Sequence, residues 1–255
     1  MLNFLDLCSL DIHYDLESNA LLCGESIKYN QFQKVRLKNL SPILLNKALT
    51  YPEDVYEEYI GVFKEDDASI NETGLSYDLI NLPAGLLGIE YVKTHVFFTP
   101  ENTVANNISS IVEVLHGDMK ILLQRNSIKG ACDFGNRVEE AYLVNLHKGN
   151  KFSIPEGFYY TFINTGESPV IFSRAYKDYC VANYEQLRKD KGLAYYCIRK
   201  NGRQEIVLNP LYRNSPQLQE VDCQCRLTNH VLDTKSSLYQ QIKGQINVLM
   251  SEINN

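Results

Sequence analysis

Short apolar stretches, separated by polar turn sequences, run from about residue 75 to residue 212. They are rich in Val, Ile, Tyr and Phe, which are residues that favour strands. We predict strands over residues 88–98, 110–115, 120–124, 140–146, 151–154, 159–163, 170–176, 194–199 and 205–208. Strands at this regular spacing predict an all-β, antiparallel sandwich or barrel. Asn201-Gly202 predicts a tight hairpin, because Asn-Gly suits the type I′ turn.

The flanking regions have helical spacing instead. Residues 41–49 and 52–59 mix apolar and acidic positions in the manner of short helices, and residues 236–253 carry an apolar stripe. We expect this last helix to pack on the barrel or on a second subunit, since its polar face is not basic. The predicted organisation is an N-terminal arm with short helices (1–74), a barrel (75–212) and a C-terminal extension (213–255). Residues 213–235 are predicted to be an irregular surface connection.

Composition narrows the choice of partners. The net charge is −6 and no basic stripe is present, which argues against nucleic acid as a partner. No apolar run reaches the roughly 18 residues of a membrane span, and the N-terminus lacks the basic start of a secretory signal. The cysteines number seven, and only Cys223 and Cys225 are close together. We therefore expect reduced cysteines in a cytoplasmic protein that does not bind a membrane.

A series of segments resembles segments of a known family, in the same order and at nearly the same spacing. They are Ile12-His13-Tyr14-Asp15, Asp54-Val55-Tyr56-Glu57-Glu58-Tyr59, Glu90-Tyr91-Val92-Lys93-Thr94, Leu115-His116-Gly117-Asp118 with Leu122-Leu123-Gln124, Ile154-Pro155, Asn164-Thr165-Gly166-Glu167-Ser168-Pro169, Lys191-Gly192-Leu193, Asn201-Gly202 and Asn209-Pro210. Together they resemble the cupin-type (archaeal-type) glucose-6-phosphate isomerases from about residue 10 to residue 212. The resemblance implies a cupin barrel (a double-stranded β-helix, or jelly roll). Together with the C-terminal apolar stripe, it favours a homodimer.

Members of that family hold a divalent metal through His-x-His, a Glu and a later His. Those ligand positions fall here on Phe97, Thr99, Ser110 and Tyr160, so all four ligands are replaced. A gapped alignment brings His95 onto the first ligand position, but one imidazole without a carboxylate neighbour does not hold a metal. The resemblance therefore predicts a diverged, metal-independent member without a cofactor.

At other positions, some residues match those of the family and others do not. Tyr56 and Thr94 match positions that resemble the family's sugar-phosphate contacts, whereas Ile80 replaces a Thr. Tyr184 is the residue retained from the family's Gly-His-Asp-Tyr segment. Binding of a sugar phosphate is one alternative that these positions leave open.

Strand alternation predicts which side chains line the barrel, since residues two apart share a face. The predicted lining consists of His95, Phe97, Thr99, Ser110, Val112, Tyr160, Phe162 and Tyr184. This interior is aromatic and hydroxyl-bearing rather than charged, and suits a mostly apolar small molecule. The alternative is that the aromatic side chains fill the barrel and nothing binds. Glu113 has the opposite parity and is expected to face solvent, and Glu65-Asp66-Asp67 is expected to be a solvated acidic loop.

Three functions follow from this pattern. The first is a metal-independent cupin that binds a small molecule and catalyses an isomerisation or related proton transfer, with His95 as the base and Tyr160 or Tyr184 as the donor. The second is a sugar-phosphate isomerase with an unconventional site. The third is a non-catalytic binding or scaffold protein, in which His95 and Tyr184 are structural.

The missing ligands predict that the purified protein carries no stoichiometric metal. Inductively coupled plasma mass spectrometry before and after chelation measures this directly. Near-stoichiometric iron, manganese, zinc or nickel would contradict the prediction and favour the sugar-phosphate isomerase.

Overall fold

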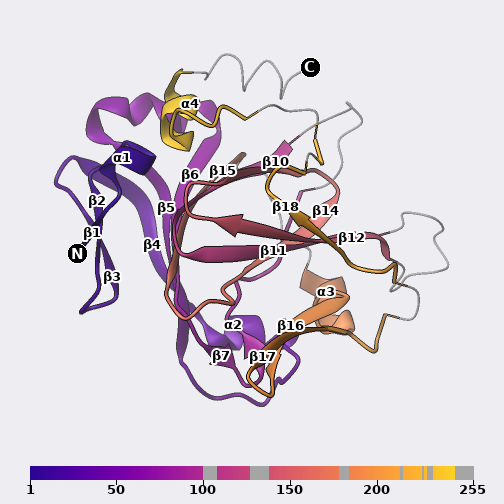
Figure 1. The fold of residues 1–255 in the computed structure, drawn as a ribbon. Coiled ribbons are helices and arrows are strands. Elements are labelled where there is room, and N and C mark those ends of the chain that lie inside the picture. Colours follow the sequence, from indigo (N-terminus) through magenta and orange to yellow (C-terminus); the bar gives the residue numbers. More distant parts are fainter. Residues whose placement is uncertain are drawn as a thin grey trace.

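Two sheets form the barrel in the computed structural model, which describes residues 1–99, 108–126, 138–177, 184–212, 215–225, 227–228 and 232–244 (Figure 1). Their strands pair antiparallel except β18, which pairs in parallel with β12. The first sheet has the order β13-β10-β15-β6-β5-β4 and the second β18-β12-β11-β14-β9. The strands of the first sheet are β4 (Ile27–Arg36), β5 (Asp54–Lys64), β6 (Leu75–Leu82), β10 (Ile108–His116), β13 (Lys151–Pro155) and β15 (Val170–Lys177). Those of the second are β9 (Phe97–Phe98), β11 (Asp118–Asn126), β12 (Val138–His147), β14 (Phe158–Ile163) and β18 (Gln219–Asp222). The predicted all-β class is confirmed.

Two smaller sheets complete the fold. One consists of β1 (Leu2–Asn3), β2 (Ile12–Asp15) and β3 (Ala20–Cys23), and the other of β7 (Leu86–Leu87), β8 (Glu90–Tyr91), β16 (Tyr195–Lys200) and β17 (Arg203–Leu208). The predicted hairpin joins β16 to β17, and Asn201 and Gly202 have φ values of 52° and 76°. Positive φ at both central residues is what a type I′ turn requires.

The helices are short. They are α1 (Leu5–Cys8), α2 (Leu37–Leu40), η1 (Ser41–Ile43), η2 (Glu65–Thr73), α3 (Tyr184–Asp190) and α4 (Leu238–Gly244). Figure 1 shows α1 and α4 near one end of the barrel and α2 and α3 near the other. None of the helices in the described ranges is long and apolar enough to cross a membrane.

Several predictions for the flanking regions are wrong. Residues 52–59 do not form a helix: most of them belong to β5, which pairs with β4 on one side and β6 on the other. Cross-strand pairing has overridden the local spacing there. Residues 219–222 are strand β18, which pairs in parallel with β12, rather than an irregular connection. Helix α4 accounts for 238–244 of the predicted 236–253, and the remaining residues of that prediction lie largely outside the described ranges.

The central strands of the first sheet are buried on both faces. All eight residues of β6 are buried. On β10, Val112 and Val114 face the interior core, whereas Ile111 and Leu115 face a second core that includes the N-terminal strands and α4. This alternation separates a barrel interior from an outer docking face.

Acidic side chains on the outer face dock α4. Glu113 is buried rather than solvated. Its carboxylate accepts a hydrogen bond from the Leu238 amide at 2.9 Å and lies 3.2 Å from Lys151 Nζ, and the side chains of both partners are buried as well. Asp67 is likewise buried, and accepts a hydrogen bond from the Tyr239 hydroxyl at 3.0 Å. The predictions that these two carboxylates face solvent are therefore wrong, because α4 covers them.

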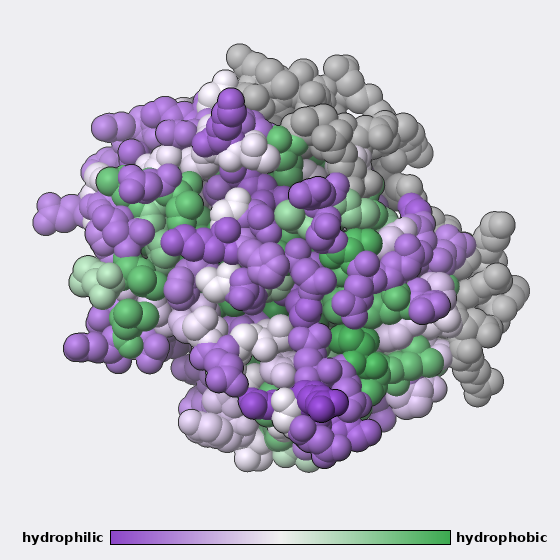
Figure 2. Space-filling view, viewed as in Figure 1, coloured by the Kyte–Doolittle hydropathy of each residue, from purple (hydrophilic) through white to green (hydrophobic). Residues whose placement is uncertain are grey.

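The visible face is mostly polar, and hydrophobic side chains gather on it both over the N-terminal strands at the left and in the right half of the view (Figure 2). Exposed large hydrophobic residues in the N-terminal part of the chain include Leu5, Leu16 and Leu22. The remainder of the visible face is mixed.

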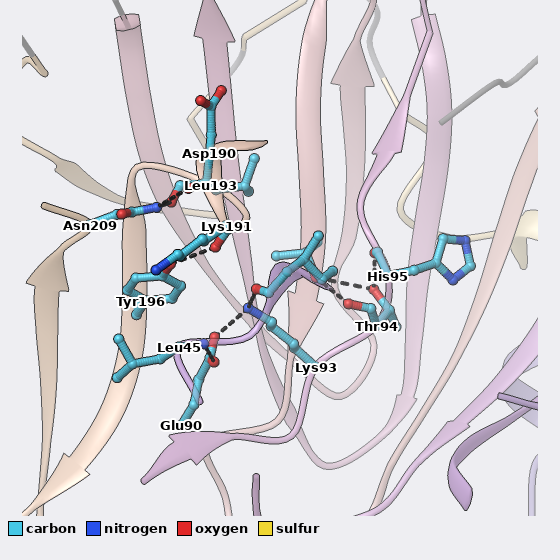
Figure 3. A network of polar contacts seen from close by, with 12 residues as sticks. Leu45, Glu90, Lys93, Thr94, His95, Asp190, Lys191, Leu193, Tyr196 and Asn209 are labelled. Atoms are coloured by element: carbon cyan, nitrogen blue, oxygen red, sulfur yellow. Dashed lines mark hydrogen bonds and ion pairs between the residues drawn. The ribbon is translucent and has the colours of Figure 1, made fainter. Parts of the chain in front are cut away.

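A buried ion pair anchors the segment that leads into the barrel interior (Figure 3). Glu90 and Lys93 pair within a site where both side chains are almost fully buried. Glu90 also accepts a hydrogen bond from the Leu45 amide at 3.0 Å, and Lys93 donates one to the Ile43 carbonyl at 3.1 Å. The family-like Glu-Tyr-x-Lys-Thr segment thus ties the residues after α2 to the barrel.

Replacing Lys93 with Met should lower the free energy of unfolding by about 3–5 kcal/mol, because it leaves the Glu90 charge buried without its partner. Urea denaturation measures the change. Lys28→Met is the matched control, since the Lys28–Glu65 pair is exposed and is worth about 0–1 kcal/mol. Equal losses in the two variants would contradict a structural role for the buried pair.

Candidate functional site

His95 meets Tyr56 inside the barrel. The Tyr56 hydroxyl and His95 Nδ1 share a short hydrogen bond, which joins β5 to the segment between β8 and β9. The His95 amide also approaches the Tyr56 hydroxyl at 3.4 Å. In Figure 3 the imidazole points away from the Glu90–Lys93 pair. His95 keeps some accessible surface, whereas Tyr56 is buried.

The segment around His95 is held along β14. The Thr94 amide donates to the Phe162 carbonyl at 2.9 Å, and the Phe162 amide donates to Thr94 Oγ1 at 3.1 Å. Thr94 Oγ1 also lies 3.3 Å from Thr161 Oγ1. The Thr94 hydroxyl, predicted as a ligand contact, is therefore occupied by backbone and side-chain partners of β14.

The aromatic residues at the replaced ligand positions pack on one another. The ring centroids of Phe97 and Tyr160 are 5.3 Å apart with an interplanar angle of 24°, and Phe162 lies 5.7 Å from Phe97. The Tyr160 hydroxyl shares a hydrogen bond of 3.0 Å with Ser110 Oγ. Tyr160 and Phe162 have no exposed surface. The structure thus brings Phe97, Tyr160, Phe162 and Ser110 together.

The other predicted lining residues are placed less centrally or lie outside what can be described. Val112 is fully buried in the same core. Thr99 shares a hydrogen bond of 2.6 Å with Ser109, so its hydroxyl has a structural partner. The Tyr184 side chain lies outside the described residues, and its predicted role stays a prediction.

The prediction of an uncharged interior is wrong. Arg174 on β15 is 4% exposed, and its Nη2 donates to Asp78 Oδ2 at 3.0 Å. The guanidinium carbon lies 3.9 Å from the centroid of the Phe97 ring and 4.0 Å from that of Tyr176. A second carboxylate, Glu58 on β5, is 2% exposed and accepts a hydrogen bond from Gln33 at 2.6 Å. Charged side chains therefore share the interior with the aromatic ones.

The sequence contains a pattern that could have predicted charged residues inside the barrel. Arg174 stands two residues after Phe172 and two before Tyr176, so strand alternation places all three on one face. Asp78 lies in the apolar segment at 75–82. What the sequence does not show is that β15 and β6 pair in the register that sets Arg174 opposite Asp78.

Burial and the positive charge of Arg174 lower the pKa of His95 to about 3. The imidazole is therefore neutral near pH 7. Burial by itself would also lower the pKa of Arg174, yet nearby negative groups, led by Asp78, raise it above its ordinary value. Arg174 stays a permanent cation beside a neutral imidazole.

Residues 38–212 match the family model described as "Glucose-6-phosphate isomerase (GPI)". The chain belongs to this family. The resemblance and the cupin barrel inferred from the sequence are thereby confirmed. No curated protein matches the chain.

Solved structures with some likeness include an oxalate decarboxylase from Bacillus subtilis, with 15% identity and a TM-score of 0.34. That match covers 52% of this chain and 28% of the decarboxylase chain. Peruvianin-I, a cysteine peptidase from Thevetia peruviana latex, is 19% identical over 41% of this chain and 50% of its own, with a TM-score of 0.28. This chain thus spans well under half the length of the decarboxylase.

The glucose-6-phosphate isomerase family implies a divalent metal, but the side chains here do not fit one. The positions that the resemblance assigns to the family's ligands hold Phe97, Thr99, Ser110 and Tyr160, none of which offers an imidazole or carboxylate. No group of three or more His, Cys, Asp or Glu side chains within the described ranges could hold a metal. The guanidinium of Arg174 lies against the Phe97 ring instead.

The lowered pKa of His95 predicts a pH dependence of stability. The unfolded chain takes up a proton at His95 near pH 6.5, whereas the folded protein does so near pH 3. The unfolded state therefore binds more protons in this window, and the free energy of unfolding falls as the pH drops from 6.5 towards 3, by up to about 1.4 kcal/mol per pH unit.

Urea denaturation of the wild type and of His95→Gln at several pH values isolates this contribution, because other titrating groups are common to both proteins. The variant should show the shallower pH dependence. His147→Gln is the control, since His147 is exposed on the surface. The same pH dependence in all three proteins would contradict a neutral, partly buried His95.

Proposed function

We propose that this family member binds a small molecule inside its barrel through side chains alone, and that His95 exchanges a proton with it. The observation that supports the proposal is the state of His95. It is a neutral imidazole with accessible surface, set beside aromatic residues that are themselves buried. A group of this kind inside a barrel can hydrogen-bond to a ligand and accept a proton from it.

The neighbouring residues have distinct parts in this proposal. Tyr56 orients the imidazole through Nδ1. Tyr160, whose hydroxyl is hydrogen-bonded to Ser110, is the nearby hydroxyl donor. A base works best when its pKa is close to the operating pH, so a bound ligand must raise the pKa of His95 from its low value in the free protein.

A sugar-phosphate isomerase is the second candidate, and the family match over residues 38–212 favours it. Tyr56 and Thr94 stand at positions that resemble the family's sugar-phosphate contacts. Both hydroxyls have partners within the fold, and the donor set for a metal is replaced, which places this candidate second. A homodimer in the cytoplasm stays a prediction.

A non-catalytic scaffold is the third candidate. It is favoured by the packing of Phe97, Tyr160 and Phe162, which fills part of the interior with rings. On this view, His95 and Tyr56 complete the core. Proton exchange with a small molecule separates this candidate from the first.

The test is deuterium exchange in D₂O followed by proton NMR, with chelated protein. Fructose 6-phosphate, glucose 6-phosphate, dihydroxyacetone phosphate and hydroxypyruvate serve as probes. Exchange at carbon next to a carbonyl should occur with the wild type, and His95→Gln should slow it by at least about 100-fold, as loss of a general base does. His147→Gln should exchange as the wild type does.

Two results would overturn the proposal. Exchange that appears only after a divalent metal is added would favour the sugar-phosphate isomerase. No exchange with any probe would remove the catalytic role of His95 and favour the scaffold.

A further inference from the structure

Arg174 has buried hydrogen-bond donors that no described residue satisfies. Its Nε and Nη1 atoms have no hydrogen-bond partner in the described part of the chain, although the side chain is only 4% exposed. Buried polar groups are normally paired, and each exception calls for an explanation. The exception here is a charged group in the middle of a barrel.

The guanidinium is held firmly in place. Asp78 accepts from Nη2, and is itself held by the Ser76 hydroxyl at 2.7 Å and the Gly61 amide at 3.1 Å. The rings of Phe97 and Tyr176 lie against the guanidinium. An arginine anchored in this way presents its remaining N–H groups with little loss of freedom on binding.

We propose that Arg174 anchors a carboxylate group of a small molecule inside the barrel. The assignment rests on the proposed function, because it requires that the interior admits a ligand, and it names the chemical class of that ligand. The free N–H groups of a guanidinium match the oxygens of a carboxylate, and hydrogen bonds between charged partners are about twice as strong as neutral ones. Ligand oxygens would satisfy the donors that the protein leaves unpaired.

The charges around Arg174 favour one negative charge on the ligand over two. Asp78 already balances the guanidinium, and burial raises the pKa of Glu58, which favours its uncharged form. The desolvation of a doubly charged phosphate would therefore be poorly compensated. The partly accessible residues next to Arg174 are His95 and Tyr176, so a ligand here lies within reach of the proposed base.

A carboxylate at Arg174 would also act on His95. The positive charge of Arg174 is one of the two causes that lower the pKa of His95. A negative charge placed beside the guanidinium offsets it, which raises that pKa towards the range where an imidazole accepts protons near neutrality. Binding and proton transfer are thereby coupled.

The experiment uses the full-length protein labelled with ¹⁵N-arginine, in which NMR follows the Arg174 Nε–H signal. Arg174→Lys identifies the signal by its loss. Sodium acetate, sodium phosphate and the uncharged acetamide are titrated separately at constant ionic strength. Acetate should shift the Arg174 signal saturably, whereas acetamide and phosphate should not.

The variants give a second measurement by titration calorimetry with acetate. Arg174→Lys should weaken binding about tenfold, because an ammonium lacks the planar fork of N–H groups. Arg36→Lys is the control and should bind as the wild type does, since Arg36 is an exposed residue of β4. Calorimetry of the wild type with acetate, phosphate and acetamide needs no variant, so the proposal is tested even if Arg174→Lys does not fold.

The other outcomes overturn either the carboxylate assignment or the proposed function. A shift with phosphate and not with acetate would assign the site to a phosphate group. No saturable shift with either anion would mean that Arg174 is structural. If acetate does not bind while His95-dependent proton exchange is observed, the carboxylate assignment falls and the proposed function stands. If acetate binds but no probe exchanges a proton, the carboxylate assignment stands and the proposed function falls.

Discussion

Burial of the central strands on both faces is the constraint on which this structure depends. Strands β6, β10 and β15 have no solvent-facing side, so a polar side chain on them is costly unless it finds a hydrogen-bond partner. Glu113 finds Lys151 and the start of α4 on the outer face, and Arg174 finds Asp78 on the inner face. Because side chains alternate between the two faces of these strands, one set of polar residues contacts the C-terminal helix and the other lies inside the barrel.

The cation that the described residues place inside the barrel is the guanidinium of Arg174. A metal ion accepts lone pairs and can activate a bound water, whereas a guanidinium donates hydrogen bonds and holds its charge permanently. The aromatic ring of Phe97 lies against that guanidinium on one side. Among the side chains around Arg174, His95 is the proposed base.

The pKa of His95 depends on a residue that is distant in sequence. Its pKa reflects both its burial and the charge of Arg174, which comes from a strand far away in sequence. Tyr56, 39 residues away, holds the same imidazole through a hydrogen bond. The reactivity of the site is therefore a property of the assembled barrel rather than of any one segment.

The sequence by itself determined the all-β class, the strands between residues 108 and 177, the Asn201-Gly202 hairpin and the parity of Phe97, Tyr160 and Phe162. The strand predicted over residues 88–98 is wrong, because only Glu90–Tyr91 and Phe97–Phe98 are strands there. Period-two alternation and turn chemistry are local, so they can be read along one chain. Only the tertiary structure decided that residues 54–64 form a strand, that α4 buries Glu113, and that Arg174 meets Asp78 across 96 residues. Those outcomes depend on the register between strands and on which element covers which face, and both arise from contacts between residues far apart in sequence.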